Sequence, residues 1–269
     1  MAVELEIRDG DPWWLSPDIW TVPGDDPEGP PGTPIAGGTT YLWASVRNNG
    51  STAAENATVR FYWADPSTGF DRSTANFIGN ANVSLMPGQV SDVLCLTPWA
   101  TTFVNGGHEC VLAEAFHASD PLPAGLAFNV TTDRHVAQRN LNVAIAMKKQ
   151  FSLSFGVQNN SRKARAFRVV AEAGTLAQLR KSAGRSDKAI IERARDGKIA
   201  RMTISDQRCP TEAELARNVT KIDGIKIGPR GRVGFTLAGT IEGASAVVHI
   251  RQFDGEHDVG GLSVLVLDQ

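Results

Sequence analysis

A succession of short alternating segments, each bounded by turn residues, limits this chain to a β-rich fold. Thr39–Val46 and Ala57–Trp63 mix β-branched, aromatic and small apolar residues, and the first runs into the turn-forming pair Asn49-Gly50. Similar segments follow: Phe77–Gly79, Asn82–Leu85, Val90–Leu96, Glu109–Phe116 and His135–Ala146. Short strands with turn signals about every 8–12 residues are typical of an antiparallel β-sandwich.

The second half of the chain repeats the first at a constant offset. Leu42–Asn49 aligns with Leu153–Asn160, and in both copies an alternating strand runs into an Asn-Asn turn and then into another strand. An offset as long as a whole domain indicates a duplicated domain. The sequence therefore predicts an all-β protein of two tandem immunoglobulin-like β-sandwiches, residues 1–140 and 141–269.

A stretch of helical pattern interrupts the second predicted sandwich. Thr175–Ala183 and Asp187–Arg195 predict two short helices, each with an apolar side. Thr211–Arg217 predicts a third, because Thr211 and Glu214 have the spacing of a capping box. We therefore expect a helical insertion over roughly residues 174–218.

Charge and aromatic residues are distributed unevenly between the two halves. The net charge of −2 conceals −10 over residues 1–140 and +8 over residues 141–269, and all six Trp and both Tyr lie in the first half. Such a shift marks a domain boundary near residue 140. It also suggests self-association, in which the acidic domain of one copy meets the basic domain of the next.

The chain contains no signal for a membrane helix or for secretion. No run of about 18 apolar residues occurs, and the acidic start of the chain lacks the basic and then apolar order of a secretory signal. The compartment is therefore left open. Three possibilities remain: the protein stays in the cytoplasm, it leaves by a signal-independent route, or the sequence lacks its leader.

The first half resembles the bacterial CARDB family, the "cell adhesion related domain found in bacteria", over about residues 16–142. The residues that carry the resemblance are Ser16–Trp20, Val46–Gly50, Val59–Pro66, Gly107–Ala113 and Arg134–Asn140. The resemblance implies an immunoglobulin-like sandwich and an adhesive or accessory role. It also implies an extracellular location, because this family is usually found on exported proteins, often beside an enzyme domain.

A search for catalytic or metal-binding patterns gives no reactive cluster. Catalysis needs a nucleophile with a base, paired carboxylates or a metal site, and the five His form no HExxH pattern. His108 and Cys110 would share one side of a strand, as zinc ligands or as a turn histidine beside a buried thiol. Asp9–Asp11 and Asp25–Glu28 are calcium-like loops or simply solvated acidic loops. We expect no enzyme activity, no cofactor and no metal.

Two cysteines in the first half allow two interpretations. Cys95 and Cys110 fall on candidate strands joined by a turn, so they would form a disulfide if they faced each other. The alternative is two buried free thiols.

The candidate binding residues are aromatic or basic. Trp13 and Trp14 cannot both point inward from an extended segment, so we expect one of them at the surface. It would contact a partner or glycan, or the segment would instead fold back and cap the open end of the first sandwich. Arg180, Lys181, Arg185 and Lys188 form a basic surface on the predicted helices. Nucleic acid is disfavoured there, because no aromatic residue interleaves and the first domain is acidic.

The sequence thus predicts a non-catalytic module for protein binding or assembly, in an adhesive or structural role. The alternatives are a carbohydrate-binding module and an accessory or inhibitor subunit of a partner enzyme.

Overall fold

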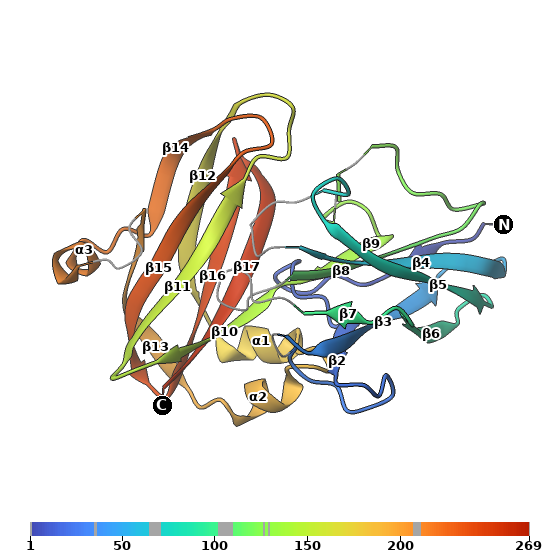
Figure 1. Ribbon diagram of the computed structural model, residues 1–269, viewed down its shortest axis with the longest axis horizontal. Helices are drawn as coiled ribbons and strands as arrows, with labels where there is room; N and C mark the ends of the chain where they lie inside the picture. The colour runs from blue at the N-terminus through green and yellow to red at the C-terminus, as the bar shows by residue number, and fades with distance from the viewer. Residues whose placement is uncertain are drawn as a thin grey trace. The chain divides into compact units, whose positions relative to one another are not determined.

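The computed structural model describes residues 2–34, 37–64, 71–101, 110–125, 127–128, 130–206 and 211–268, without the side chains of Val143 and Ile145. Most of these residues form strands (Figure 1). The chain divides into two compact units. Unit 1 comprises Met1–Ala64, Ala75–Arg139 and Lys181–Ala189, and unit 2 comprises Asp65–Thr74, Asn140–Arg180 and Ile190–Gln269. Each half of the sequence therefore contributes one short segment to the unit that the other half builds.

Unit 1 contains two antiparallel sheets. In the first, β3 (Thr39–Asn48) pairs with each of the other four strands: β1 (Leu5–Glu6), β2 (Ile19–Pro23), β6 (Val90–Leu94) and β7 (Trp99–Ala100). The second has the order β5-β4-β8-β9 and consists of β5 (Asn76–Leu85), β4 (Ala54–Ala64), β8 (Cys110–Phe116) and β9 (Val136–Arg139). β5 and β6 are joined by a turn at Pro87-Gly88, in which Gln89 N donates to Met86 O (3.0 Å) and Gly88 has a φ of +74°. A positive φ at the third position of a turn favours glycine.

The core of unit 1 lies between its two sheets. Val59 and Phe61 on β4 and Ala113 on β8 are fully buried, and so are Leu42 and Val46 on β3. These residues recur at every second or fourth position, because successive side chains of a strand point to opposite faces. Burying one large side chain such as Phe61 contributes about 1.5–3 kcal/mol.

Unit 2 contains a five-stranded and a three-stranded sheet. The larger has the order β10-β17-β16-β12-β14 and consists of β10 (Leu141–Ala146), β17 (His257–Asp268), β16 (Ser245–Asp254), β12 (Arg165–Gly174) and β14 (Lys221–Ile227). The smaller has the order β11-β15-β13 and consists of β11 (Gln150–Gln158), β15 (Arg232–Gly243) and β13 (Gly197–Ser205). β10 runs parallel to β17, whereas the other pairs are antiparallel. Figure 1 shows the long strands β12, β15 and β16 in yellow to red.

Unit 2 has its own apolar core. Phe155 on β11 stacks on Phe235 of β15, with ring centroids 5.9 Å apart. Leu237 from the smaller sheet and Val248 and Val264 from the larger are fully buried in the same cluster. The predicted all-β sandwich class is confirmed.

The internal repeat is present in the structure, at the level of single hydrogen bonds. Asn48 Nδ2 donates to Thr52 O (2.9 Å), and its Oδ1 accepts from Gly50 N (3.0 Å). Asn159 Nδ2 donates to Lys163 O (2.8 Å), and its Oδ1 accepts from Ser161 N (2.9 Å). The offset that aligns the two asparagines also aligns each pair of partners. β3 and β11, with the turns that follow them, are therefore equivalent.

The predicted helical insertion is correct for its helices and wrong for its middle. The helices are α1 (Leu176–Lys181), α2 (Lys188–Arg193) and α3 (Glu212–Ala216), and Thr211 and Glu214 form the expected capping box. Residues 197–205 instead form β13, which pairs with β15 and places Met202 and Ile204 in the core of unit 2. Pairing with the distant strand β15 makes residues 197–205 a strand. Their charged residues hid the alternating pattern that would have predicted it.

Candidate interaction surfaces

The two adjacent tryptophans near the start of the chain have different environments. Trp14 is 1% exposed, whereas Trp13 is half-buried, and the two rings meet edge to face at 5.4 Å. The backbone of Asp11 holds this segment through Ser182, whose Oγ accepts from Asp11 N and donates to Asp11 O, both at 2.9 Å. Only Trp13 is therefore partly accessible to a ligand.

A second aromatic group is used for packing inside unit 1. Trp20 and Trp43 stack, with their centroids 5.8 Å apart and their planes 10° apart. The guanidinium of Arg185 lies 3.9 Å from the centroid of the Trp20 ring, a cation–π contact. Arg185 also donates to Asp92 on β6 (2.8 Å). Of the predicted basic surface, Arg185 is therefore engaged within its own unit.

The other predicted basic residues lie at the ends of the short helices. Arg180 and Lys181 are exposed at the end of α1, and Lys188 is exposed at the start of α2. Arg180 belongs to unit 2 and donates to Ala194 O (3.2 Å), whereas the other two belong to unit 1.

Residues Lys181–Ala189 are built into unit 1 by a buried ion pair. Arg139 at the end of β9 and Asp187 are both buried, and Arg139 Nη2 donates to the Asp187 carboxylate. Arg139 Nη1 also donates to Ser16 O (2.5 Å) and Ser182 O (3.1 Å). This pair was not predicted, because the two residues are far apart in the chain and the residues around Asp187 have the pattern of a basic surface.

Of the two interpretations of the cysteine pair, the disulfide is wrong, because Cys95 and Cys110 are free and buried. Cys95 directly follows β6, where its N donates to Leu42 O (2.9 Å) of β3, whereas Cys110 begins β8 in the other sheet of unit 1. The segments were expected to be neighbouring strands, but they lie in different sheets. Burial raises the pKa of both thiols, so neither is poised as a nucleophile.

The predicted metal candidates fall partly outside the described residues. His108 and Glu109 lie outside them, as does Cys209. Within the described ranges, no three or more His, Cys, Asp or Glu side chains are arranged to hold a metal ion. Asp25, Asp26 and Glu28 are exposed, and Asp26 Oδ1 accepts from Glu28 N (3.0 Å). None of the described helices has the length and apolarity for crossing a membrane.

Unit 1 also buries a carboxylate that the sequence analysis did not single out. Glu114 on β8 is fully buried, and its Oε1 accepts from Tyr62 Oη (2.7 Å) while Arg60 Nη1 lies 3.6 Å away. Burial and the Glu114 hydrogen bond raise the pKa of Tyr62. The phenol therefore remains a proton donor, and the group acts as an internal polar network of the sheet.

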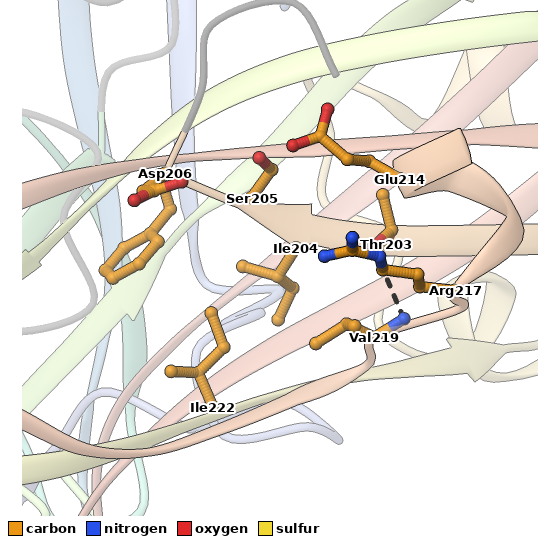
Figure 2. A pocket seen from close by; sticks show the side chains of 9 residues that line it. Thr203, Ile204, Ser205, Asp206, Glu214, Arg217, Val219 and Ile222 are labelled. Atoms are coloured by element: carbon orange, nitrogen blue, oxygen red, sulfur yellow. Dashed lines mark hydrogen bonds between the residues drawn. The ribbon is translucent and has the colours of Figure 1, made fainter. Parts of the chain in front are cut away.

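Unit 2 has a pocket of about 260 Å³ between the end of β13, α3 and the start of β14 (Figure 2). Its apolar lining is Ile204, Val219, Ile222 and Phe235, with Asp206 and Arg217 among its polar residues. In Figure 2, Ile204 lies between Asp206 and Arg217, and Ile222 lies below it. This combination would admit a small ligand or one side chain of a partner.

The polar groups around the pocket are partly committed to local structure. Glu214 Oε2 accepts from Thr211 N (2.7 Å) and Thr211 Oγ1 (3.0 Å), and these bonds lower the pKa of Glu214. Thr203 Oγ1 accepts from Val219 N (3.3 Å), the dashed line in Figure 2. Both groups help to hold α3 and the chain that follows it.

A charge-poor edge of unit 1 exposes large apolar side chains. We call Asn76–Leu96 the β5–β6 edge, because it contains both strands, the turn between them and two residues beyond β6. Phe77 is 57% exposed, Met86 63%, Val90 45% and Leu96 74%. A Cβ at Gly79 would lie 2.6 Å from Thr97 Oγ1, so the start of β5 lies beside the segment that follows β6.

The sequence signal for this edge is the absence of charge. From Ser73 to Gly107 the chain has one charged residue, Asp92, although charged residues make up 21% of the whole. The alternating pattern placed the strands but gave no indication of which apolar side chains would remain exposed.

Comparison with known proteins gives structural likenesses only. No family model matches the chain, and no curated protein matches it. The CARDB domain of a Pyrococcus furiosus protein, in complex with di-metal ions, is 15% identical over 52% of this chain and 86% of that chain, with a TM-score of 0.30.

Larger enzymes contain similar regions. Red sea bream transglutaminase is 8% identical, with a TM-score of 0.25, and the match covers 94% of this chain and 31% of that one. A β-glucosidase from Listeria innocua is 11% identical, with a TM-score of 0.26, over 51% of this chain and 16% of that one. The chain spans less than a third of either enzyme. It resembles a CARDB domain and has an all-β sandwich fold.

Proposed function

We propose that this chain is a non-catalytic protein-binding module and that the β5–β6 edge of unit 1 is its contact surface. The observation that carries the proposal is the exposure of Phe77, Met86, Val90 and Leu96 along one continuous segment. Full burial of one such side chain gives about 1.5–3 kcal/mol of favourable free energy. A partner that covered these side chains would gain the share that belongs to their exposed surface. Large apolar side chains that remain exposed in this way are typical of interaction sites.

The electrostatics of the edge support a protein partner. The centres of protein interfaces are depleted in charged residues, and the β5–β6 edge has only Asp92, which already pairs with Arg185. Binding of a partner would therefore bury almost no unpaired charge of the β5–β6 edge. This favours a partner that is itself apolar and uncharged at the contact.

The carbohydrate-binding alternative needs an accessible aromatic platform. Trp20 packs between Arg185 and Trp43, and Trp14 is buried. Trp43 is half-buried, and its Nε1 donates to Pro27 O (3.0 Å). Trp14, Trp20 and Trp43 thus have a role in the packing of unit 1, and of the pair Trp13 and Trp14 only the half-buried Trp13 is partly accessible to a sugar.

Site-specific photo-crosslinking in the native cells tests the proposal. A benzophenone amino acid at position 77 or 96 is expected to give a discrete protein adduct. The same amino acid at position 52 is the matched control, because Thr52 is exposed in the turn between β3 and β4 of the same unit. No adduct from positions 77 and 96, or the same adducts from all three positions, would rule out this contact surface.

A further inference from the structure

We infer that the β5–β6 edge binds a second copy of this chain, by antiparallel pairing of β5 with the β5 of the partner. This inference rests on the proposed function, because it names the protein that the contact surface takes. Three features of β5 favour such pairing: its free side, its lack of charge and the positions of the apolar side chains at its ends.

One side of β5 is bonded and the other is open. β5 is the terminal strand of the order β5-β4-β8-β9, and the only strand that pairs with it within the described ranges is β4. In the part of the chain that the structure describes, the backbone N–H and C=O groups on its far side therefore lack strand partners, and such a row is a template for adding another strand. The register with β4 is continuous from Gly79 to Val83, which gives a regular stretch for pairing.

The pairing of β5 with β4 is irregular near both ends, but β5 lacks the side-chain features that usually protect an edge strand. Its ten residues include no charged residue and no proline. By contrast, two edge strands of unit 2 carry charge, with Lys198 and Arg201 on β13 and Lys221 and Lys226 on β14. Charged side chains on an edge strand prevent addition of another strand.

Another edge strand shows that the missing charge is only half of the argument. β11 is also uncharged, but its large apolar side chains Phe151, Leu153 and Phe155 are buried in the core of unit 2. β5 combines an uncharged edge with exposed apolar groups at both ends, Phe77 at one and Met86 just beyond the other. This combination distinguishes β5 from β11, β13 and β14.

A second copy of β5 fits this edge because β5 has an exposed apolar side chain at each end and uncharged polar residues between them. In a two-fold antiparallel pair, each end of β5 meets the opposite end of its counterpart, so Phe77 approaches the partner's Met86. The exposed Asn80, Asn82 and Ser84 lie between these ends and would face the same uncharged residues across the pair. No like charges would meet, and polar and apolar cross-strand pairs would both form.

Measurement of self-association with one charge substitution tests the inference. We expect the full-length chain to dimerise in sedimentation equilibrium, and Asn80→Lys to raise the dimer Kd by about tenfold or more, because two lysines then meet near the symmetry axis. Asn80 is exposed on β5. Thr52→Lys adds the same charge at the exposed β3–β4 turn of unit 1 and should leave the Kd unchanged.

Hydrogen exchange separates strand pairing from other modes of dimerisation. Amides of residues 76–85 should become more protected as the protein concentration rises, and Asn80→Lys should remove this gain while leaving dilute-state exchange unchanged. The dimer should also persist between about 50 and 500 mM salt, because no charge lies on β5. A monomeric chain, or a dimer without this added protection, would overturn the inference.

The photo-crosslinking experiment separates this inference from the proposed function. An adduct of the chain with itself from position 77 supports both. An adduct with a different protein supports the proposed contact surface and overturns the pairing with a second copy. The absence of any adduct from positions 77 and 96 overturns both.

Discussion

At the scale of single residues, Asn48 and Asn159 perform the same structural role in the two units. Both are fully buried at the end of a strand, and each amide holds the turn that follows. Asn48 Nδ2 also donates to Leu85 O (3.2 Å), and Asn159 Nδ2 donates to Ile227 O (3.0 Å). A buried carbonyl is costly to leave without a donor, so each asparagine stabilises its own unit.

Asn48→Ala and Asn159→Ala should each lower the free energy of unfolding by about 1–3 kcal/mol, because each leaves buried carbonyls without donors. All six tryptophans lie between residues 13 and 99, so their fluorescence reports on unit 1. In urea titrations, Asn48→Ala should shift the transition seen by fluorescence, whereas Asn159→Ala should shift only the one seen by far-UV circular dichroism. Asn49→Ala, at the exposed neighbour, should have little effect. Equal effects of Asn48→Ala and Asn49→Ala would contradict this role.

At the scale of elements, the stretch from α1 to α3 shows how tertiary contacts override a local pattern. The periodicity predicted short helices, and α1, α2 and α3 form where the apolar positions and the Thr211 cap indicated. It did not predict that Lys181–Ala189 would belong to unit 1, or that residues 197–205 would form β13. Both outcomes depend on partners far away in the sequence, Arg139 and β15.

Asp187→Ala should destabilise unit 1 by about 3–5 kcal/mol, because it leaves the buried Arg139 guanidinium without its counter-charge. The measurement is the urea midpoint from tryptophan fluorescence. Lys181→Ala removes an exposed charge from the same segment and should change stability by less than about 0.5 kcal/mol. An unchanged fluorescence transition for Asp187→Ala would show that this segment does not support unit 1.

At the scale of the whole molecule, each unit has its own core but not its own uninterrupted stretch of chain. The core of unit 1 is centred on residues such as Phe61 and Leu42, and that of unit 2 on residues such as Leu237 and Val248. Lys181–Ala189 nevertheless belongs to unit 1, and Asp71 of the first half pairs with Arg230 of unit 2 at 2.7 Å. Cutting the sequence near residue 140 therefore does not isolate either unit in full.

A fragment of residues 1–140 should unfold at a lower urea concentration than unit 1 does in the full chain, because the fragment lacks Asp187. The shift should be at least as large as that of Asp187→Ala, since Ser182 and Ser186 are also lost. Tryptophan fluorescence measures both proteins in the same way. Identical midpoints for the fragment and the full chain would show that residues 1–140 are stable without the segment.

The sequence alone determined the all-β class, the internal repeat, the short helices and the capping box, because these depend on local alternation, turn residues and spacing. Only the tertiary structure decided that Cys95 and Cys110 lie in different sheets, that Arg139 meets Asp187 and that Arg185 covers Trp20. It also decided which apolar residues remain exposed on the β5–β6 edge. The physical reason is the same in each case: strand alternation specifies which face a side chain points to, but the distant segment that packs against that face is chosen by the balance of contacts in the folded chain.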